Sequence, residues 1–414
     1  MNRTLYTLLL YALLPFVPLR LLWRSRKQPE YVRHIGERFG FYRSAPAAKR
    51  AIWIHAVSVG ETRAAEPLVR ALSERYPDHR ILITHMTPTG RETGELLFGD
   101  NVERCYLPYD YPGAVRRFLA HFGPAAGILM ETELWPNLIH AAATRNVPVY
   151  LVNARLSEKS YAGYRRHAGL ARGALQDLAG IAAQTEADAQ RLRALGARHP
   201  RVTGNLKFDI VPPPALVQLG AEWRASYGDR PVLLAASTRA GEEELLLDAF
   251  ERMAVPHALF VIVPRHPDRF DEVTALVQRR GFRCQRRSAN FAVPRETAVL
   301  VGDSLGEMFA YYAACDVAFI GGSLLPYGSQ NLIEACAVGK PALIGPSTYN
   351  FAEAAQLAIE CGAALSVADV SELAAKAREL LTDERAASRM GEAAIAFCRA
   401  HQGAAHRVLE LMRF

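Results

Sequence analysis

The sequence has few cysteines, and they form no arrangement that would build a site. The six cysteines are spread over 414 residues, with no C-x-x-C pair and no short paired spacing. A disulfide framework and a cysteine-rich zinc site are therefore not expected, and the free thiols fit a reducing compartment. Most of the cysteines lie in apolar sequence surroundings, where a thiol behaves as a small core side chain.

Local motifs of several common nucleotide and metal sites are also missing. The chain contains no Asp-x-Asp pair and no cluster of His and Cys at ligand spacing. A metal-dependent sugar-nucleotide site is therefore not indicated. The absence of G-x-x-x-x-G-K-[ST] excludes a P-loop NTPase. We expect neither a metal ion nor an organic cofactor.

Charge is distributed unevenly along the chain. Half of the residues are hydrophobic and 22% are charged, which disfavours a disordered chain or a polytopic membrane protein. Residues 1–50 carry ten basic and two acidic side chains, whereas the rest of the chain has a net charge of −1. A nucleic-acid-binding protein would spread its basic residues over a folded face. We therefore expect a membrane surface, and no nucleic acid, as a partner.

The N-terminal segment joins an apolar run to a basic flank. Thr4–Leu19 is uncharged, and Arg24, Arg26 and Lys27 follow it. The run is shorter than the about 20 residues that a membrane-crossing helix needs, and two prolines interrupt it. No small-residue cleavage site follows the run, which disfavours a signal peptide.

We expect residues 1–27 to form an N-terminal membrane-anchor helix with its basic flank. Because positive charge stays on the cytoplasmic side, this anchor would place the body of the protein on the cytoplasmic face of a bacterial inner membrane. The alternative is a buried helix of a soluble domain.

The body of the chain alternates short apolar runs with amphipathic stretches. This alternation predicts strands separated by helices, and hence parallel sheets covered on both faces. Three consecutive prolines interrupt the alternation, which then restarts. We predict an α/β fold with two doubly wound, Rossmann-like domains that face a central cleft, an N-terminal one over 28–210 and a C-terminal one over 215–414, joined by a proline hinge at 211–214.

Three segments of the first domain carry candidate catalytic side chains. Glu61 opens the helix after the first strand, where it can be a general base or can simply stabilise the helix start. Glu131 and Glu133 follow the strand Ala126–Met130, and the alternative reading of this segment is that Thr132 or Glu133 caps the next helix. Lys207 precedes the hinge and is placed to stabilise an anionic leaving group, unless it is a solvated surface lysine.

The second domain places polar and glycine-rich segments after successive strands. Arg265 and His266 supply donors suited to phosphate, unless they cap a neighbouring helix. Gly302–Met308 begins a helix after a further strand, and Gly321–Ser323 ends the next strand, where backbone amides can approach an oxyanion. Asn331–Glu334 opens a helix, and its glutamate is placed to accept hydrogen bonds from ribose hydroxyls. The recurrence of such segments predicts a nucleotide site.

Together these motifs closely resemble those of the Kdo transferases of Gram-negative bacteria. The matching segments extend over nearly the whole chain: His55–Glu61, Met86–Gly90, Tyr106–Asp110, Met130–Asn137, Asn153–Ser157, Leu206–Asp209, Val263–Pro267 and Gly321–Ser323. The resemblance implies a GT-B fold and transfer of 3-deoxy-D-manno-oct-2-ulosonic acid (Kdo) from CMP-Kdo to the lipid A precursor lipid IVA, in lipopolysaccharide biosynthesis at the inner membrane.

The same resemblance implies residue roles. Glu61 would be the proton acceptor, and Glu131 and Lys207 would stabilise the transition state. The implied CMP contacts are Arg265, His266, Gly306, Glu307, Met308, Asn331, Leu332, Ile333 and Glu334. Some relatives have Gly-Gly-His-Asn where this chain has Gly-Ser-Gln-Asn, so the contact made by Gln330 stays open. Because one phosphate leaves and one base acts, the expected mechanism is metal-independent and inverting.

Two other functions fit parts of the pattern. A GT-B transferase that uses a UDP- or ADP-sugar would have the same double fold, because a fold does not determine a function. A membrane-tethered scaffold without activity is the second alternative. The joint presence of the candidate catalytic and CMP-binding residues argues against that scaffold.

Overall fold

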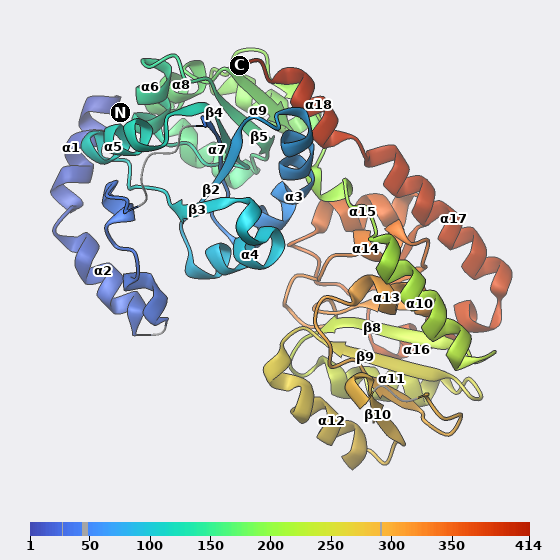
Figure 1. The fold of residues 1–414 in the computed structure, drawn as a ribbon. Helices are drawn as coiled ribbons and strands as arrows, with labels where there is room; N and C mark the ends of the chain where they lie inside the picture. Colours follow the sequence, from blue (N-terminus) through green and yellow to red (C-terminus); the bar gives the residue numbers. More distant parts are fainter. Residues whose placement is uncertain (27, 44–48, 290–291) are drawn as a thin grey trace. The chain divides into compact units, whose positions relative to one another are not determined.

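The computed structural model describes residues 1–26, 28–43, 49–289 and 292–414, which form two compact units (Figure 1). Unit 1 consists of Met1–Asp209 and Gln402–Phe414, and unit 2 of Ile210–His401. Each unit contains one seven-stranded sheet in which all paired neighbours run parallel. The predicted α/β fold with two doubly wound domains is confirmed.

The sheet of unit 1 has the order β3-β2-β1-β4-β5-β6-β7. Its strands are β1 (Ala51–His55), β2 (Arg80–His85), β3 (Glu103–Tyr106), β4 (Pro124–Met130), β5 (Val149–Ala154), β6 (Gly180–Ala183) and β7 (Arg201–Val202). The helices that follow them are α3 (Val59–Arg75), α4 (Pro88–Phe98), α5 (Pro112–Phe122), α6 (Pro136–Ala143), α7 (Glu158–Arg165), α8 (Ala168–Gln176) and α9 (Glu186–Ala194), with short 3-10 helices η1 (Pro29–Val32), η2 (Glu37–Phe39), η3 (Gly99–Asn101) and η4 (Leu206–Phe208). The strand order reverses between β1 and β4, and ligands of such folds bind at this switch point.

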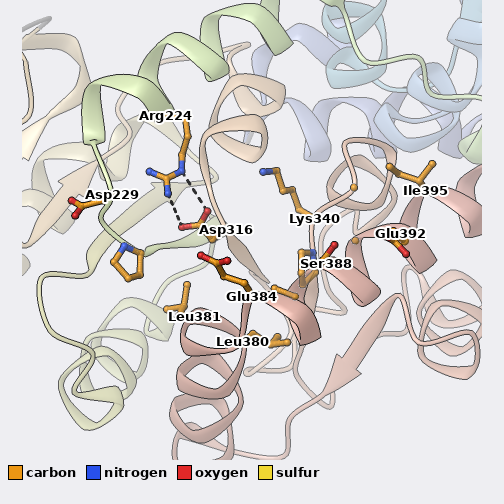
Figure 2. A pocket seen from close by; sticks show the side chains of 15 residues that line it. Arg224, Asp229, Asp316, Lys340, Leu380, Leu381, Glu384, Ser388, Glu392 and Ile395 are labelled. Carbon is orange, nitrogen blue, oxygen red and sulfur yellow. Dashed lines mark hydrogen bonds and ion pairs between the residues drawn. The ribbon is translucent and has the colours of Figure 1, made fainter.

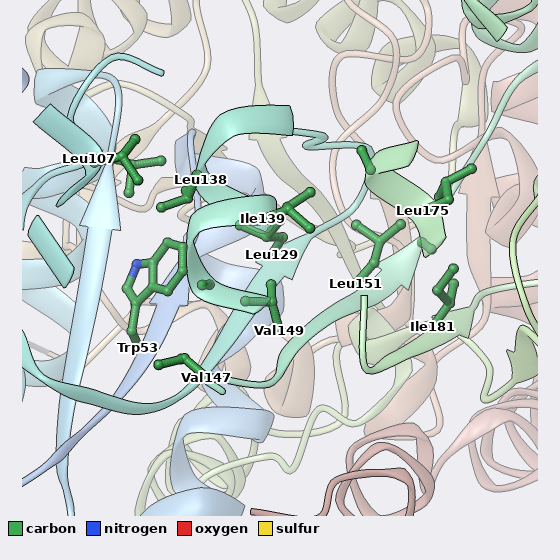
Figure 3. Close-up of a cluster of buried hydrophobic side chains, with 14 of the residues drawn as sticks. Trp53, Leu107, Leu129, Leu138, Ile139, Val147, Val149, Leu151, Leu175 and Ile181 are labelled. Atoms are coloured by element: carbon green, nitrogen blue, oxygen red, sulfur yellow. The ribbon is translucent and has the colours of Figure 1, made fainter. Parts of the chain in front are cut away.

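Both faces of the unit 1 sheet are buried, because neighbouring residues of a strand point to opposite faces. Trp53 of β1 belongs to the cluster drawn in Figure 3, whereas Ile52 and Ile54 belong to the cluster on the other face. The Trp53 indole lies so close to Gly127 of β4 that a Cβ there would be 2.6 Å from the ring. The indole N–H donates to the Thr84 hydroxyl at 2.7 Å. A large aromatic core residue thus aligns the three central strands.

The sheet of unit 2 has the order β10-β11-β9-β8-β12-β13-β14. Its strands are β8 (Val232–Thr238), β9 (Leu259–Pro264), β10 (Cys284–Arg286), β11 (Val299–Val301), β12 (Val317–Ile320), β13 (Ala342–Ile344) and β14 (Ala364–Ser366). Its helices are α10 (Pro214–Tyr227), α11 (Glu242–Met253), α12 (Phe270–Arg279), α13 (Met308–Ala314), α14 (Ile333–Ala337), α15 (Ala352–Glu360), α16 (Val370–Thr382) and α17 (Glu384–His401), with short 3-10 helices η5 (Pro267–Arg269) and η6 (Arg287–Ala289). The loops after β11, β9, β8 and β12 therefore leave the sheet side by side.

The predicted extent of the C-terminal domain, 215–414, is wrong at its C-terminal end. The last segment returns to unit 1, where α18 (Ala404–Leu411) packs against α3 and buries Val408 and Leu409. Asp209 holds the start of α18, because its carboxylate accepts hydrogen bonds from the backbone N–H groups of Gly403, Ala404 and Ala405. The proline segment is also shorter than predicted, since Pro214 is already the first residue of α10.

The N-terminal segment forms two helices rather than the expected single one. α1 (Arg3–Leu13) and α2 (Phe16–Ser25) meet at a bend of 59°. In the described residues no single helix is long and apolar enough to cross a membrane, although this bent pair passes by length and composition. Lys27 of the predicted basic flank lies outside the described residues.

One side of α1 is docked on unit 1. The Thr7 hydroxyl donates to the Asn137 amide oxygen at 3.0 Å, and the Tyr111 hydroxyl donates to the Leu10 carbonyl at 3.2 Å. Tyr6 hydrogen-bonds to the carboxyl of Asp110, whose pKa burial raises to about 7. Large apolar side chains remain exposed on the two helices: Leu5, Leu8, Leu9, Leu13, Phe16, Leu19, Leu22 and Trp23. We call this set the α1–α2 apolar face.

The capping carboxylate at the start of α18 yields a stability prediction. Asp209→Ala leaves three backbone N–H groups without their acceptor, so the free energy of unfolding of unit 1 falls by about 1–2 kcal/mol. Urea unfolding together with hydrogen exchange at residues 403–405 measures the loss. The control is Asp78→Ala, at an exposed position. Equal stability and equal exchange in the two variants would contradict the assigned role.

Candidate functional site

Glu61 lies in the first turn of α3, immediately beyond the carboxyl end of β1. Its carboxylate accepts a hydrogen bond from the backbone N–H of Val57 at 2.8 Å and another from the Ser58 hydroxyl at 3.1 Å. Ser58, the N-cap, in turn accepts from the backbone N–H of Glu61 at 3.5 Å. This reciprocal pair resembles a capping box, with the backbone N–H of Val57, the residue before the N-cap, in place of the N-cap N–H. The helix-stabilising role is therefore real, yet each carboxylate oxygen keeps a lone pair for a further donor.

The surroundings of Glu61 favour its neutral form. Burial raises the pKa of Glu61 to about 8, and the negative charges of Glu131 and Glu133 act in the same direction, while the hydrogen bond from Val57 opposes them. A carboxylate with a pKa near neutrality is a far stronger base than an exposed glutamate and is still ionised in part at pH 7. The geometry thus combines a capping role with the electrostatics of a general base.

Glu131 and Glu133 stand on the loop that follows β4. Glu131 has a left-handed backbone conformation, with φ of +56°, and its N–H donates to the Val152 carbonyl at 2.9 Å. The Glu133 carboxylate accepts from the Trp135 indole N–H at 2.9 Å, and burial raises the pKa of Glu133. The Trp135 ring meets the buried His55 ring edge-on at 5.6 Å. The loop is therefore anchored to β1, the strand that leads to Glu61.

Neither of these two acids caps the helix that follows. The first backbone N–H groups of α6, those of Asn137 and Leu138, donate instead to the carboxylate of Asp110, at 2.9 and 2.8 Å. The alternative that Thr132 or Glu133 caps this helix is therefore wrong, since α6 has no side-chain bond from its N-cap and takes Asp110 instead. Both carboxylates therefore stand at the switch point of the sheet, where that of Glu133 is held by the Trp135 indole.

Lys207 belongs to η4, a turn that packs against α3. The Asn153 side chain, at the end of β5, accepts from the backbone N–H of Leu206 at 3.0 Å, and the Asn205 side chain accepts from that of Lys207 at 3.0 Å. Lys207 is half-buried. The turn that carries this ammonium group is thus held beside the helix that carries Glu61.

In unit 2 the predicted cationic residues follow β9. The backbone N–H of Arg265 donates to the Thr238 carbonyl at 3.0 Å, which ties this loop to the end of β8. The imidazole of His266 makes no capping bond to η5. It lies instead 3.0 Å from the guanidinium Nη1 of Arg239. The helix-capping alternative therefore fails for His266.

The remaining predicted nucleotide contacts lie after β11 and β12. Gly306 has a φ of +80°, and Glu307 is the N-cap residue of α13, with its carboxylate 3.4 Å from Arg287. The Asn331 amide donates to the Glu334 carboxylate at 3.2 Å, and its oxygen accepts from the N–H of Ile333 at 3.1 Å. The 331–334 segment is thus a closed turn at the start of α14, in which the asparagine orients the glutamate.

The glycine turn after β12 does not offer its amides to a ligand. The N–H of Gly322 donates at 2.6 Å to the buried carboxylate of Glu242, which also accepts from Leu324 at 3.1 Å and Arg239 at 2.9 Å. The N–H of Gly321 donates to a carbonyl of β8. The oxyanion prediction for these two amides is wrong, because a buried carboxylate of the protein needs the donors itself.

A pocket of about 490 Å³ lies at the other end of the unit 2 sheet, near the amino ends of β8, β12 and β13. Figure 2 shows the Arg224–Asp316 ion pair and Lys340 among its lining side chains. No predicted site residue lines this pocket. The candidate site is built by the opposite, carboxyl ends of the strands.

Two residues of the candidate site are not assigned by the sequence analysis. Glu133 is recognised there as an acid but receives no role, and its electrostatic effect on Glu61 appears only in the folded chain. Arg239 was not singled out, although it follows β8 as Arg265 follows β9. Within the described residues no group of three His, Cys, Asp or Glu side chains is arranged to hold a metal ion.

Comparison with known proteins gives similarity over the whole chain. A family profile described as "3-Deoxy-D-manno-octulosonic-acid transferase (kdotransferase)" matches residues 33–210, and one described as "Glycosyl transferases group 1" matches residues 243–397. The chain is 45% identical to the 3-deoxy-D-manno-octulosonic acid transferase of Bordetella pertussis and 37% identical to that of Haemophilus influenzae. Each match covers all of this chain, and 99% and 98% of the relatives.

A solved structure matches the fold of both units together. The UDP-GlcNAc 2-epimerase of Neisseria meningitidis aligns with 87% of this chain and 99% of its own, with a TM-score of 0.58 and 16% sequence identity. At this identity the likeness shows the GT-B fold with its two Rossmann-like domains and nothing of the substrate.

The three-carboxylate arrangement predicts a coupled titration. Glu133→Gln removes one negative charge near Glu61 at constant size, so the pKa of Glu61 falls by about half a unit to one unit. A carboxyl-carbon NMR titration of glutamate-labelled protein measures this, with the Glu61 signal assigned by its loss in Glu61→Gln. Glu74→Gln, at the exposed far end of α3, is the control and leaves the pKa unchanged. An unchanged pKa in Glu133→Gln would refute the coupling.

Proposed function

Because the chain belongs to the 3-deoxy-D-manno-octulosonic acid transferase family and is therefore a glycosyltransferase, we propose that it transfers Kdo from CMP-Kdo to lipid IVA. The observation that supports this proposal is that each of the two sheets carries one of the two kinds of group that the reaction needs. A carboxylate with a pKa of about 8 stands at the carboxyl edge of unit 1, and guanidinium and imidazole groups stand at the carboxyl edge of unit 2. The first suits activation of a hydroxyl, and the second suits a phosphate leaving group.

In the proposed reaction Glu61 removes the proton from the 6′-hydroxyl of the acceptor disaccharide. The acceptor oxygen then forms a bond to the anomeric carbon of Kdo, while the bond from that carbon to the phosphate oxygen breaks. CMP leaves with the electron pair of that bond. One displacement on the face opposite the leaving group inverts the anomeric configuration.

Two further side chains stabilise the charges that develop in this step. The Glu131 carboxylate would face the positive charge that builds up at the sugar ring, and the Lys207 ammonium would face the negative charge on the departing phosphate. Their position supports these roles, because η4 packs on α3 and the negative charge of Glu131 acts on Glu61. The reaction requires the base of unit 1 and the donor of unit 2 to meet during turnover.

The donor would be held by unit 2. Arg265 and His266 would contact the phosphate, Gly306–Met308 would contact the cytidine, and the Asn331–Glu334 turn would accept hydrogen bonds from the ribose. A nucleoside monophosphate carries a single phosphate group, so arginine and histidine donors can stabilise it in place of a divalent cation. This is the basis for a metal-independent mechanism without a cofactor.

The acceptor is an amphiphile, and the N-terminal helices supply a matching surface. The α1–α2 apolar face is exposed, while Arg20 and Arg24 on α2 are also exposed or half-exposed. Apolar side chains beside basic ones fit a bilayer interface with anionic headgroups. We propose that this face binds the cytoplasmic leaflet of the inner membrane, where lipid IVA lies.

The decisive experiment is transfer by the purified full-length protein. Incubation with CMP-Kdo and lipid IVA is expected to give Kdo-bearing product by mass spectrometry, with a rate that rises with pH through about 8, because Glu61 must lose its proton. Glu61→Gln lowers the rate by about 10²–10⁴-fold and leaves CMP binding intact, while Glu74→Gln changes neither.

Two outcomes would contradict the proposal. Comparable transfer by Glu61→Gln would remove the assigned base. Tighter calorimetric binding of UDP or ADP than of CMP would contradict the donor and favour another sugar nucleotide.

Membrane binding is tested separately. The double change Leu8→Asp and Leu19→Asp puts two charges on the α1–α2 apolar face, so binding to vesicles of phosphatidylethanolamine and phosphatidylglycerol falls by at least about tenfold. A sedimentation assay measures the bound fraction. Leu96→Asp on α4, another exposed leucine outside this face, is the matched control. Undiminished binding of the double variant would refute the assignment.

A further inference from the structure

Arg239 stands at the end of β8, next to the predicted cationic residues of β9. The two strands lie side by side (Figure 1) and pair in parallel, with Thr238 opposite Pro264. Arg239 and Arg265 therefore follow adjacent strand ends. Arg239 belongs to none of the sequence motifs described above. Its position nevertheless adds a second guanidinium group to the edge of the sheet that already carries the Arg265 guanidinium and the His266 imidazole.

The side chain of Arg239 is held by groups that carry no negative charge. Its Nη1 lies 3.0 Å from Nε2 of His266, and its guanidinium lies over the Tyr327 ring, 4.9 Å from the ring centre. The Tyr327 hydroxyl in turn donates to the Ala240 carbonyl at 3.0 Å. The guanidinium is thus oriented from two sides without being neutralised by either contact.

The neighbouring Arg269 shows the contrast. Its guanidinium forms ion pairs with Glu243 at 2.7 Å and with Glu272 at 3.1 Å. Arg239 has no ion pair with any carboxylate in the part of the chain that the structure describes. The carboxylate of Glu242 approaches only the backbone N–H of Arg239 and is satisfied by three backbone amides. The charge of Arg239 is therefore left for an external anion.

His266 completes the donor arrangement. A guanidinium only donates, so Nε2 of His266 must accept and the imidazole proton must be on Nδ1. Burial and the positive charges of Arg239, Arg265 and Arg269 lower the pKa of His266, against the opposite effect of Asp268, which keeps the ring in this neutral form. The Nδ1–H group of His266 therefore remains as a hydrogen-bond donor beside the guanidinium of Arg239.

A third loop borders the same place. A Cβ built on Gly322 would be 3.2 Å from the Gln330 amide nitrogen and 3.4 Å from Cγ of Arg239. Gly322 and Gln330 both follow β12, which pairs with β8 on the side away from β9. Gln330 and Arg239, from the segments that follow β12 and β8, therefore border a position that glycine keeps free of a side chain.

We propose that Arg239 binds the phosphate of the CMP-linked donor, beside His266. The inference rests on the proposed function and adds a residue to it. A guanidinium presents two parallel N–H groups that match two phosphate oxygens, and its charge stabilises the phosphate further as the bond to the sugar breaks. Arg239 is thus a direct phosphate ligand in a site that uses no metal ion.

Calorimetry with two nucleoside probes tests the assignment. Arg239→Gln lowers the affinity for CMP by at least about tenfold, the effect of losing a hydrogen bond to a charged group, and leaves the affinity for cytidine unchanged. Arg239→Lys keeps the positive charge but lacks the two parallel N–H groups of the guanidinium, so it recovers only part of the CMP affinity. Arg279→Gln, an exposed arginine on α12, is the control and binds both ligands as the wild type does.

Each of the other outcomes contradicts the proposal, and each has its own pattern of binding affinities. Equal CMP affinity in wild type and Arg239→Gln refutes the phosphate contact and leaves the proposed function standing. An equal loss for CMP and cytidine in both Arg239 variants shows a purely structural role. A loss for CMP-Kdo but not for CMP assigns Arg239 to the sugar carboxylate instead. A wild type that binds no CMP refutes the proposed function itself.

Discussion

The position and the environment of Glu61 in unit 1 depend on how the chain turns from β1 into α3. A serine N-cap and Glu61 exchange hydrogen bonds there, and these bonds, with the one from the Val57 N–H, fix the carboxylate at the switch point of the sheet. Burial next to two other glutamates then raises the pKa of Glu61 to about 8. The same turn therefore provides both the hydrogen bonds that begin the helix and the buried environment that raises the pKa of Glu61. A helix-capping glutamate on an exposed surface would have the same geometry and almost none of the basicity.

In unit 2 a buried carboxylate has a structural purpose. Glu242 takes the backbone amides of the glycine turn and of Arg239, and so fixes the loops after β8 and β12 to each other. Burial of an acid is tolerated because three N–H groups surround it. Since these amides are no longer available, an anion at this edge must be met by side chains. The cluster of Arg239, Arg265 and His266 supplies such donors.

Both ends of the chain are attached to unit 1 by buried or half-buried acids. Asp209 caps α18, and Asp110 caps α6 while also receiving a hydrogen bond from Tyr6 of α1. The N-terminal helices are therefore docked along one side and leave the α1–α2 apolar face uncovered. This arrangement differs from a freely projecting anchor, because side-chain contacts fix which residues of α1 face away from the protein.

The sequence by itself determined the alternation of strands and helices, the two domains and the strand ends that carry chemistry, because these follow from local apolar periodicity and from glycine and acidic residues placed after strands. It missed β7, two exposed residues with no apolar run, and the return of 402–414 to unit 1. Only the tertiary structure decided that Glu133 acts on Glu61, that Glu242 fills the glycine turn and that Arg239 lies against His266. Such contacts join residues far apart in the chain or depend on burial, and neither long-range pairing nor desolvation is encoded in a local pattern.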